Sequence, residues 1–175
     1  MTTLALIESL IRPVPDFPKP GILFRDITPL LADAEGLRAA VDALLEPWRA
    51  RPPQVFCGVE SRGFIFAAAM AQSLGCGFAP IRKPGKLPGP VLRERYSLEY
   101  GEDMLELRAD ALPVGAEVVV IDDVLATGGT LTAACALVSR SGARLRGAGV
   151  LIELSGLAGR GRLSELDALH AVLSY

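Results

Sequence analysis

The feature that most constrains the fold is a pattern that occurs twice: a short apolar run, a segment with helical spacing, and a second short apolar run. The strands expected from this pattern are residues 55–59, 78–81, 117–121 and 149–154, and the helices between them are residues 64–74 and 129–141. Runs as apolar as these are typical of strands covered on both faces, as in parallel sheets. The sequence therefore predicts an α/β fold, in which a mostly parallel twisted sheet is flanked by helices.

The rest of the chain adds elements around these two units. Residues 4–11 have helical spacing, residues 14–27 carry several prolines and are expected to form an ordered connection, and Asp33 is expected to cap a further helix. The apolar residues of that helix recur at intervals of three or four, which predicts one buried face made of Leu37, Val41, Leu44, Leu45 and Trp48. His170, the only histidine, lies in a short alternating strand and is interpreted as structural.

Residues 83–107 interrupt the alternation of strands and helices. This segment is rich in glycine, proline and charge, and its alternating stretches 96–100 and 104–107 predict a hairpin around Gly101. Ligands of open α/β folds bind at the carboxyl ends of the strands, so the insertion is placed to act as a flexible lid.

Composition limits the kind of partner. The chain has 175 residues, half of them apolar, which favours one domain over residues 1–175. A formal net charge of -2, with both signs interspersed, gives no indication of nucleic-acid or membrane binding and favours small-molecule partners. Cys57, Cys76 and Cys135 lie in apolar surroundings without CxxC spacing, which predicts buried thiols in a reducing compartment. A cytoplasmic protein is expected, because the N-terminal segment lacks the pattern of a signal peptide and no apolar run is long enough to span a membrane.

The segment VVVIDDVLATGGT, residues 118–130, carries the clearest functional motif. Two carboxylates, Asp122 and Asp123, follow a buried strand, and a short loop of threonine and glycine then leads into a helix. Backbone N–H groups at a helix start, together with threonine hydroxyls, can surround a phosphate that glycine allows to approach closely. Because carboxylates repel phosphate, they suit the hydroxyls of an attached sugar or a magnesium-bound diol. The implied ligand is a ribose 5-phosphate.

Known families differ in the residues that complete such a loop. A nucleoside-triphosphate P-loop requires a lysine after its glycines, and none follows the glycines here. The loop also lacks the GxGxxG motif of dinucleotide-binding folds. The apolar strand, acidic pair and threonine–glycine loop resemble the signature of the type I phosphoribosyltransferases. Residues 17–31, 58–66 and 82–107 also resemble the adenine phosphoribosyltransferase family, and the match covers nearly the whole chain.

This resemblance implies the type I phosphoribosyltransferase fold and a pentosyltransferase of purine salvage. Such an enzyme transfers ribose 5-phosphate from phosphoribosyl pyrophosphate to adenine, giving AMP and pyrophosphate. The nucleophile is then a ring nitrogen of adenine, and Mg²⁺ arrives with the pyrophosphate group of the substrate rather than in a site built by the protein. The resemblance also implies a homodimer.

The resemblance assigns roles to the sugar-phosphate side of the site. Asp122 and Asp123 bind the ribose diol, and the 5-phosphate is bound by Ala126, Thr127, Gly128, Gly129 and Thr130. Pyrophosphate is bound by Glu60, Ser61, Arg62, Arg82, Lys83 and Lys86, with a cis peptide bond between Glu60 and Ser61. The cations of the lid, residues 82–107, are Arg82, Lys83, Lys86, Arg93 and Arg95. The closed lid excludes water from the electron-deficient sugar, and Arg82 can act across a dimer interface.

The base side of the site follows from the same resemblance. Glu99 is the candidate acid or base for adenine, and Tyr100 helps to place it. An N-terminal base-binding segment, residues 1–32, supplies one wall of the adenine slot, and residues near the acidic pair supply the other. The adenine-binding residues are Leu23, Phe24, Arg25, Val124 and Leu125.

Two other functions fit parts of the pattern. The sugar-phosphate loop alone does not distinguish adenine from hypoxanthine, guanine or xanthine, although the usual glutamate-first acidic pair of 6-oxopurine enzymes is not found here. A regulatory protein could use the same fold to sense its ligand while binding DNA or RNA, but it would need extra basic surface, and the charge balance is slightly acidic.

Overall fold

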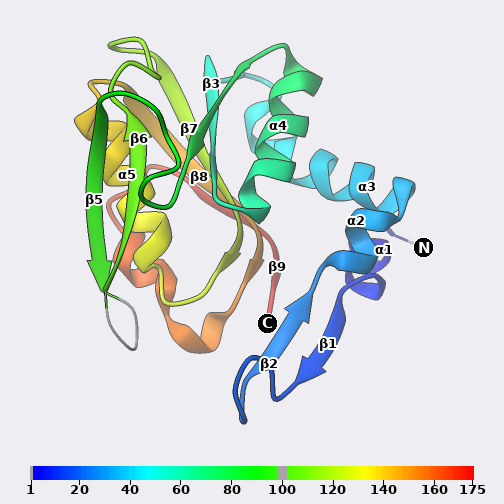
Figure 1. Ribbon diagram of the computed structural model, residues 1–175. Coiled ribbons are helices and arrows are strands. Elements are labelled where there is room, and N and C mark those ends of the chain that lie inside the picture. The colour runs from blue at the N-terminus through cyan, green and yellow to red at the C-terminus, as the bar shows by residue number, and fades with distance from the viewer. Residues whose placement is uncertain (1, 98–101) are drawn as a thin grey trace. The chain divides into compact units, whose positions relative to one another are not determined.

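The computed structural model describes residues 2–97 and 102–175 and divides into two compact units (Figure 1). The first unit is Met1–Ala43 and the second is Leu44–Tyr175. The boundary falls in the last turn of helix α3 (Ala34–Leu45). Each unit is described by itself.

The first unit contains two short helices, a two-stranded ribbon and most of α3. Helix α1 (Thr3–Ser9) begins after Thr2, whose hydroxyl accepts a hydrogen bond from the Ala5 N–H. Strands β1 (Arg12–Pro15) and β2 (Leu23–Asp26) pair antiparallel, and α2 (Thr28–Ala32) follows. The Asp33 carboxylate accepts from the Gly36 N–H at 2.7 Å, which confirms the predicted cap of α3.

The ribbon is a refinement of the ordered connection expected at residues 14–27. Pro13 and Pro15 lack the N–H that a central strand needs, so the sequence pattern did not predict β1. A two-stranded ribbon tolerates these prolines because each of its strands has a free edge. Arg12 Nη2 lies 2.6 Å from Asp26 Oδ2 across the ribbon. The turn contains a cis bond at Phe17–Pro18 and a left-handed Gly21, with φ of +85°.

The second unit is built on a parallel five-stranded sheet in the order β4-β3-β7-β8-β9. The strands are β3 (Val55–Val59), β4 (Gly77–Ile81), β7 (Glu117–Leu125), β8 (Arg144–Glu153) and β9 (Leu169–Ser174). Helix α4 (Arg62–Leu74) joins β3 to β4, and α5 (Gly129–Arg140) joins β7 to β8, which confirms both predicted strand–helix–strand units. Figure 1 shows α4 and α5 on opposite faces of the sheet.

The predicted hairpin of the lid is also present. Strands β5 (Val91–Ser97) and β6 (Glu102–Arg108) pair antiparallel, and β5 packs against α5. The backbones of Arg82 and Glu106 exchange hydrogen bonds of 2.9 and 2.7 Å, so the segment after β4 is attached to β6. The turn around Gly101 lies outside the described residues.

The core of the second unit lies between the sheet and α5. Buried side chains such as Val118, Val120, Leu137 and Val150 form one apolar cluster. Short 3-10 helices complete the chain: η1 (Glu46–Trp48) carries the buried Trp48, and η2 (Ser155–Leu157) and η3 (Gly159–Leu163) join β8 to β9. Among the described residues, no helix combines the length and the apolar character needed to cross a membrane.

Three predictions need correction. Strand β8 begins at Arg144 rather than at Gly149, because Arg144 and Arg146 interrupt the apolar pattern without interrupting the backbone pairing to β7. Strand β7 does not end at Ile121: it remains paired with β8 as far as Leu125, opposite Glu153, so Asp122 and Asp123 lie within the strand. The acidic pair ended the apolar run in the sequence, but backbone pairing to β8 does not depend on side-chain polarity. Cys57 and Cys135 are buried as expected, whereas Cys76 is only half-buried.

Candidate functional site

The topology of the sheet selects the position of the site. Strand β3 leads to β4 on one side and β7 leads to β8 on the other, so β3 and β7, which are parallel neighbours, are followed by strands added on opposite sides. In open α/β sheets, ligands bind outside the carboxyl ends of the strands at such a switch point. The residues that follow β3 are Glu60 to Arg62, and the end of β7 carries the acidic pair and the phosphate loop. The sheet therefore brings two predicted subsites, separated in sequence, to one edge.

The acidic pair is buried and lies beside one cation of the other subsite. Asp122 and Asp123 are 7% and 5% exposed, and Arg62 Nε lies 2.8 Å from Asp123 Oδ2. The Asp123 N–H donates to Asp122 Oδ1 at 2.9 Å. Burial raises the pKa of Asp122 well above its usual range, and the adjacent Asp123 charge adds to this effect. Burial also raises the pKa of Asp123, and Arg62 opposes that rise.

The first turn of α4 packs directly on Ile121 and Asp122 of β7. A Cβ atom at Gly63 would lie 2.7 Å from the Ile121 carbonyl oxygen and 3.1 Å from Asp122 Oδ1. Only glycine allows this approach without displacement of the strand. The peptide bond between Glu60 and Ser61 is cis, as expected, and it precedes this turn. The turn after β3 and the acidic pair are thus in fixed register with each other.

The phosphate loop follows β7 and ends at the start of α5. Residues 124–131 line a small cavity of about 50 Å³. Gly128 is left-handed, with φ of +86°, and its carbonyl accepts the Thr132 N–H at 2.9 Å in the first turn of α5. The N-terminus of a helix of this length offers unpaired N–H groups and a positive dipole end to an anion.

Glu60 gathers the cations that follow β4. Its Oε2 atom lies 3.2 Å from Arg82 Nε and accepts the Lys83 N–H at 2.8 Å, and its Oε1 atom lies 2.5 Å from Lys86 Nζ. Burial alone would raise the pKa of Glu60, but the hydrogen bonds from Lys86, the Lys83 N–H and Arg82 lower it to about 2. The carboxylate is therefore ionised. It is the anion that Arg82, Lys83 and Lys86 contact, and these three residues were predicted to bind pyrophosphate.

The remaining lid cations have other partners. Lys83 Nζ pairs with Asp103 and with the Tyr96 hydroxyl, and Arg93 Nε lies 2.8 Å from Glu106 Oε1. Glu106 is 1% exposed and also accepts the Gly85 N–H at 3.0 Å. Arg95 lies 3.7 Å from Glu102, and both side chains are mostly exposed. The structure therefore groups Arg82 and Lys86 around Glu60, while Arg93 and Arg95 face acidic residues of β6.

Several of these residues were missed from the sequence. Glu106 and Asp103 look like ordinary polar positions of an alternating strand. The register of β5 and β6 places Glu106 opposite Arg93, whereas Asp103 meets Lys83, which lies outside both strands. Gly63 carried a signal, since glycine at the start of a helix is unfavourable unless close packing requires it.

Other predicted residues are not brought together here. Glu99 and Tyr100 lie outside the described residues. Leu23, Phe24 and Arg25 belong to the first unit, and Val124 and Leu125 to the second, so each wall of the adenine slot is placed only within its own unit. Phe24 packs edge-on against Phe17, with ring centroids 5.1 Å apart. Among residues 2–97 and 102–175, no three His, Cys, Asp or Glu side chains are grouped so that they could hold a metal ion.

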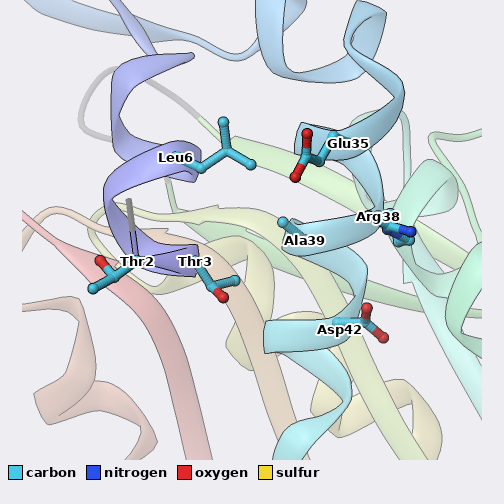
Figure 2. A pocket seen from close by; sticks show the side chains of 7 residues that line it. All are labelled: Thr2, Thr3, Leu6, Glu35, Arg38, Ala39 and Asp42. Carbon is cyan, nitrogen blue, oxygen red and sulfur yellow. The ribbon is translucent and has the colours of Figure 1, made fainter.

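The first unit has a cavity of its own. Figure 2 shows this cavity, of about 500 Å³, between α1 and α3. Its lining residues are Thr2, Thr3, Leu6, Glu35, Arg38, Ala39 and Asp42, and none of them is a predicted site residue. The Glu35 side chain is directed toward Leu6, whereas Arg38 and Asp42 are directed away from α1.

Comparison with known proteins defines the class to which this site belongs. A family described as the phosphoribosyl transferase domain matches residues 31–167, which include the acidic pair, the phosphate loop and the lid. The class is therefore that of proteins built on a phosphoribosyl transferase domain, and the sheet-edge site is consistent with it.

Individual relatives narrow the class. An adenine phosphoribosyltransferase from Xanthomonas axonopodis pv. citri is 53% identical over 165 residues, which cover 94% of this chain and 89% of that protein. The structure of adenine phosphoribosyltransferase from Rhodothermus marinus is 48% identical, with a TM-score of 0.91 and coverage of 99% and 98% of the two chains. The Giardia lamblia enzyme complexed with 9-deazaadenine is 34% identical, with a TM-score of 0.93 and coverage of 100% and 99%. The chain belongs to the adenine phosphoribosyltransferase family.

Proposed function

We propose that this chain transfers the ribose 5-phosphate group of phosphoribosyl pyrophosphate to adenine, which gives AMP and releases pyrophosphate. The observation that carries this proposal is the juxtaposition of the buried acidic pair, Arg62 and the phosphate loop at one edge of the sheet. The relatives support adenine as the base, because proteins named adenine phosphoribosyltransferase match nearly the whole chain. The fold is that of type I phosphoribosyltransferases.

The acidic pair is proposed to bind the ribose diol. A carboxylate accepts hydrogen bonds from two vicinal hydroxyls, and such bonds to a charged acceptor are stronger than neutral ones. Arg62 stabilises the ionised form of Asp123, which is the form that accepts these bonds. A ligand that donates hydrogen bonds to Asp122 would lower the raised pKa of that group and favour its ionisation.

The loop after β7 is proposed to bind the 5-phosphate. Residues Ala126 to Thr130 present backbone N–H groups and two threonine hydroxyls beside the α5 N-terminus. Their distance along the chain from the acidic pair is short, as the one ribose that connects the diol to the 5-phosphate requires.

The turn after β3 and the lid are proposed to bind pyrophosphate. Arg82, Lys86 and the Lys83 N–H already surround one carboxylate, Glu60, so the cluster is built to hold negative charge. A phosphate oxygen offers these cations the same charge and acceptor chemistry as Glu60. Pyrophosphate is thus expected to compete with Glu60 for Arg82 and Lys86, while Ser61 and Arg62 contact it from the turn. In place of the direct binding role that the resemblance implies, Glu60 is proposed to hold these cations when pyrophosphate is absent.

The base side of the reaction is proposed to depend on Glu99, Tyr100 and the adenine-binding residues. Glu99, assisted by Tyr100, is proposed to exchange a proton with adenine, whose ring nitrogen attacks the anomeric carbon as pyrophosphate leaves. Leu23, Phe24, Val124 and Leu125 are proposed to bind the base, and Arg25 to read its exocyclic amine through the main chain.

Mg²⁺, a homodimer and a cytoplasmic location are further parts of the proposal. The acidic pair offers the oxygen atoms that Mg²⁺ prefers, but it is two residues at the bottom of the ribose subsite rather than a closed cage, which fits a cation that enters with phosphoribosyl pyrophosphate. When bound, Mg²⁺ neutralises charge on the leaving pyrophosphate.

A base-selectivity assay tests the proposed function. Pyrophosphate release is measured with phosphoribosyl pyrophosphate and Mg²⁺, in parallel with adenine, hypoxanthine, guanine and xanthine. Turnover with adenine alone is expected. Turnover only with a 6-oxopurine would refute adenine as the substrate, and ligand binding without turnover on any base would favour a regulatory protein.

A further inference from the structure

The phosphate loop rests on a segment that none of the sequence motifs includes. Gly159 begins the 3-10 helix η3 after β8, and it is buried. A Cβ atom at this position would lie 2.1 Å from the Ala126 carbonyl oxygen and 2.9 Å from the Gly128 nitrogen. Both distances are below any that a real Cβ atom shows to backbone, so the two backbones touch where any other residue would separate them.

The contact is reciprocal. A Cβ atom at Gly128 would lie 2.6 Å from the Gly159 carbonyl oxygen, and the left-handed φ of Gly128 disfavours any other residue there. Gly128 of the loop and Gly159 of η3, 31 positions apart in sequence, thus contact each other through their backbones. Such a backbone-to-backbone contact leaves the loop no room to move toward η3.

The segment that carries Gly159 is itself fixed to the sheet. Arg160 forms a two-pronged ion pair with Glu153 at the end of β8, with Nη2 to Oε2 at 2.5 Å and Nε to Oε1 at 3.0 Å. Its Nη1 donates to the Leu169 carbonyl at 3.0 Å, at the start of β9. Leu163, at the end of η3, is buried in the core cluster that also contains Leu131 of α5.

We infer that Gly159 is a positioning residue for the 5-phosphate subsite, held by Arg160 so that its backbone sets the shape of residues 126–128. This inference rests on the proposed function, which places the 5-phosphate in that loop. A side chain at residue 159 would displace residues 126–128, which line the small cavity. Ligands that carry a ribose 5-phosphate should lose affinity, whereas pyrophosphate, bound by the turn after β3 and the lid, should not.

The test compares Gly159→Ala with Gly161→Ala. Gly161 lies in the same 3-10 helix, and a Cβ atom there would have nothing within 4 Å, so it is a matched control for glycine replacement. The KM values of AMP and of pyrophosphate are measured in the reverse reaction, together with kcat and the melting temperature. Gly159→Ala is expected to raise the KM of AMP on the order of tenfold to a hundredfold, because a misplacement of about 1 Å can cost up to about a hundredfold. The KM of pyrophosphate should change by less than about twofold, and Gly161→Ala should resemble the wild type.

Equal KM values of AMP in Gly159→Ala and the wild type would overturn the inference, as would a parallel rise of both KM values. If Gly159→Ala does not fold, Arg160→Gln provides the same test, since it removes the ion pair to Glu153 without adding bulk. It should raise the KM of AMP selectively, and an unchanged value would overturn the inference. A wild-type protein that shows no reaction with AMP and pyrophosphate would instead refute the proposed function.

Discussion

Replacing Asp122 by asparagine should make the ligand-free protein more stable and the enzyme less active. Asp122 is 7% exposed, its pKa is raised by burial and then by the neighbouring Asp123, and Arg62 pairs with Asp123 rather than with Asp122. The ionised form of this carboxylate is therefore poorly compensated. Asparagine has nearly the same shape, and its carbonyl oxygen can still accept the Asp123 N–H.

The stability gain can be bounded from the cost of poorly satisfied buried groups. Such a group costs about 1–3 kcal/mol, and more when it is charged, so Asp122→Asn should raise the free energy of unfolding by at least about 1 kcal/mol at pH 8. The folded-state pKa is raised above 3.8, so the folded protein binds the extra proton, and the cost of the ionised group appears as pH rises through the raised pKa. The difference between variant and wild type should vanish below pH of about 4 and grow with rising pH.

The loss of activity follows from the proposed role. Hydrogen bonds to a charged acceptor contribute about 1.5–3 kcal/mol, which corresponds to roughly a tenfold to hundredfold fall in kcat/KM for phosphoribosyl pyrophosphate. Asp123→Asn is the matched comparison: it should lose similar activity but gain little stability, because Arg62 loses its ionic partner. Urea unfolding from pH 4 to pH 9 and steady-state kinetics measure both effects. An Asp122→Asn protein that is less stable than the wild type at pH 8 would refute this reasoning.

Four further predictions concern Glu60, Gly63 and the cysteines. Glu60→Gln should lower the free energy of unfolding at pH 7 by about 1–3 kcal/mol. The pKa of Glu60 is lowered to about 2, so this carboxylate contributes stability that is present above its ordinary pKa of 4.5 and is lost as pH falls toward 2. Equal urea midpoints at pH 7 would contradict this. The same variant should bind inorganic pyrophosphate more tightly by calorimetry, since Arg82 and Lys86 no longer have a competing carboxylate. Gly63→Ala should lower kcat/KM by about tenfold or more, because the added Cβ would lie 2.7 Å from the Ile121 carbonyl oxygen and displace the acidic pair. The control is Gly156→Ala, which has open space around the added Cβ and should behave as the wild type. Cys76 should react first with iodoacetamide at pH 8, because burial raises the pKa of Cys57 and Cys135 to about 12, and mass spectrometry that found Cys57 labelled first would be inconsistent with that burial.

The sequence predicted the parallel sheet because its strands are short apolar runs and its helices have a different period. The same signal could not locate the end of β7, since strand pairing continues through Asp122 and Asp123, where the apolar run stops. Strand β1 was missed because proline removes the usual strand pattern, although a two-stranded ribbon tolerates it.

Site residues that are contiguous in sequence could be predicted, whereas contacts between distant segments could not. The phosphate loop and acidic pair are contiguous in sequence, so their residue types and order were sufficient to predict a ribose 5-phosphate ligand. Contacts between distant segments were not predictable: Glu60 meets Arg82 and Lys86 only because β3 and β4 are neighbours in the sheet. Gly159 meets the loop only because η3 folds back beside it, and a lone glycine in a connection gives no sign of its partner.

The central claim is that the acidic pair and the loop after β7 together hold one ribose 5-phosphate. A crystal structure of this protein with AMP and Mg²⁺ pyrophosphate tests it most directly. We expect ribose hydroxyl oxygens within about 2.6–3.2 Å of the Asp122 and Asp123 carboxylates, and the 5-phosphate on the N–H groups of residues 126–130. An AMP molecule whose phosphate lies on Arg82 and Lys86, with its ribose away from the acidic pair, would contradict it.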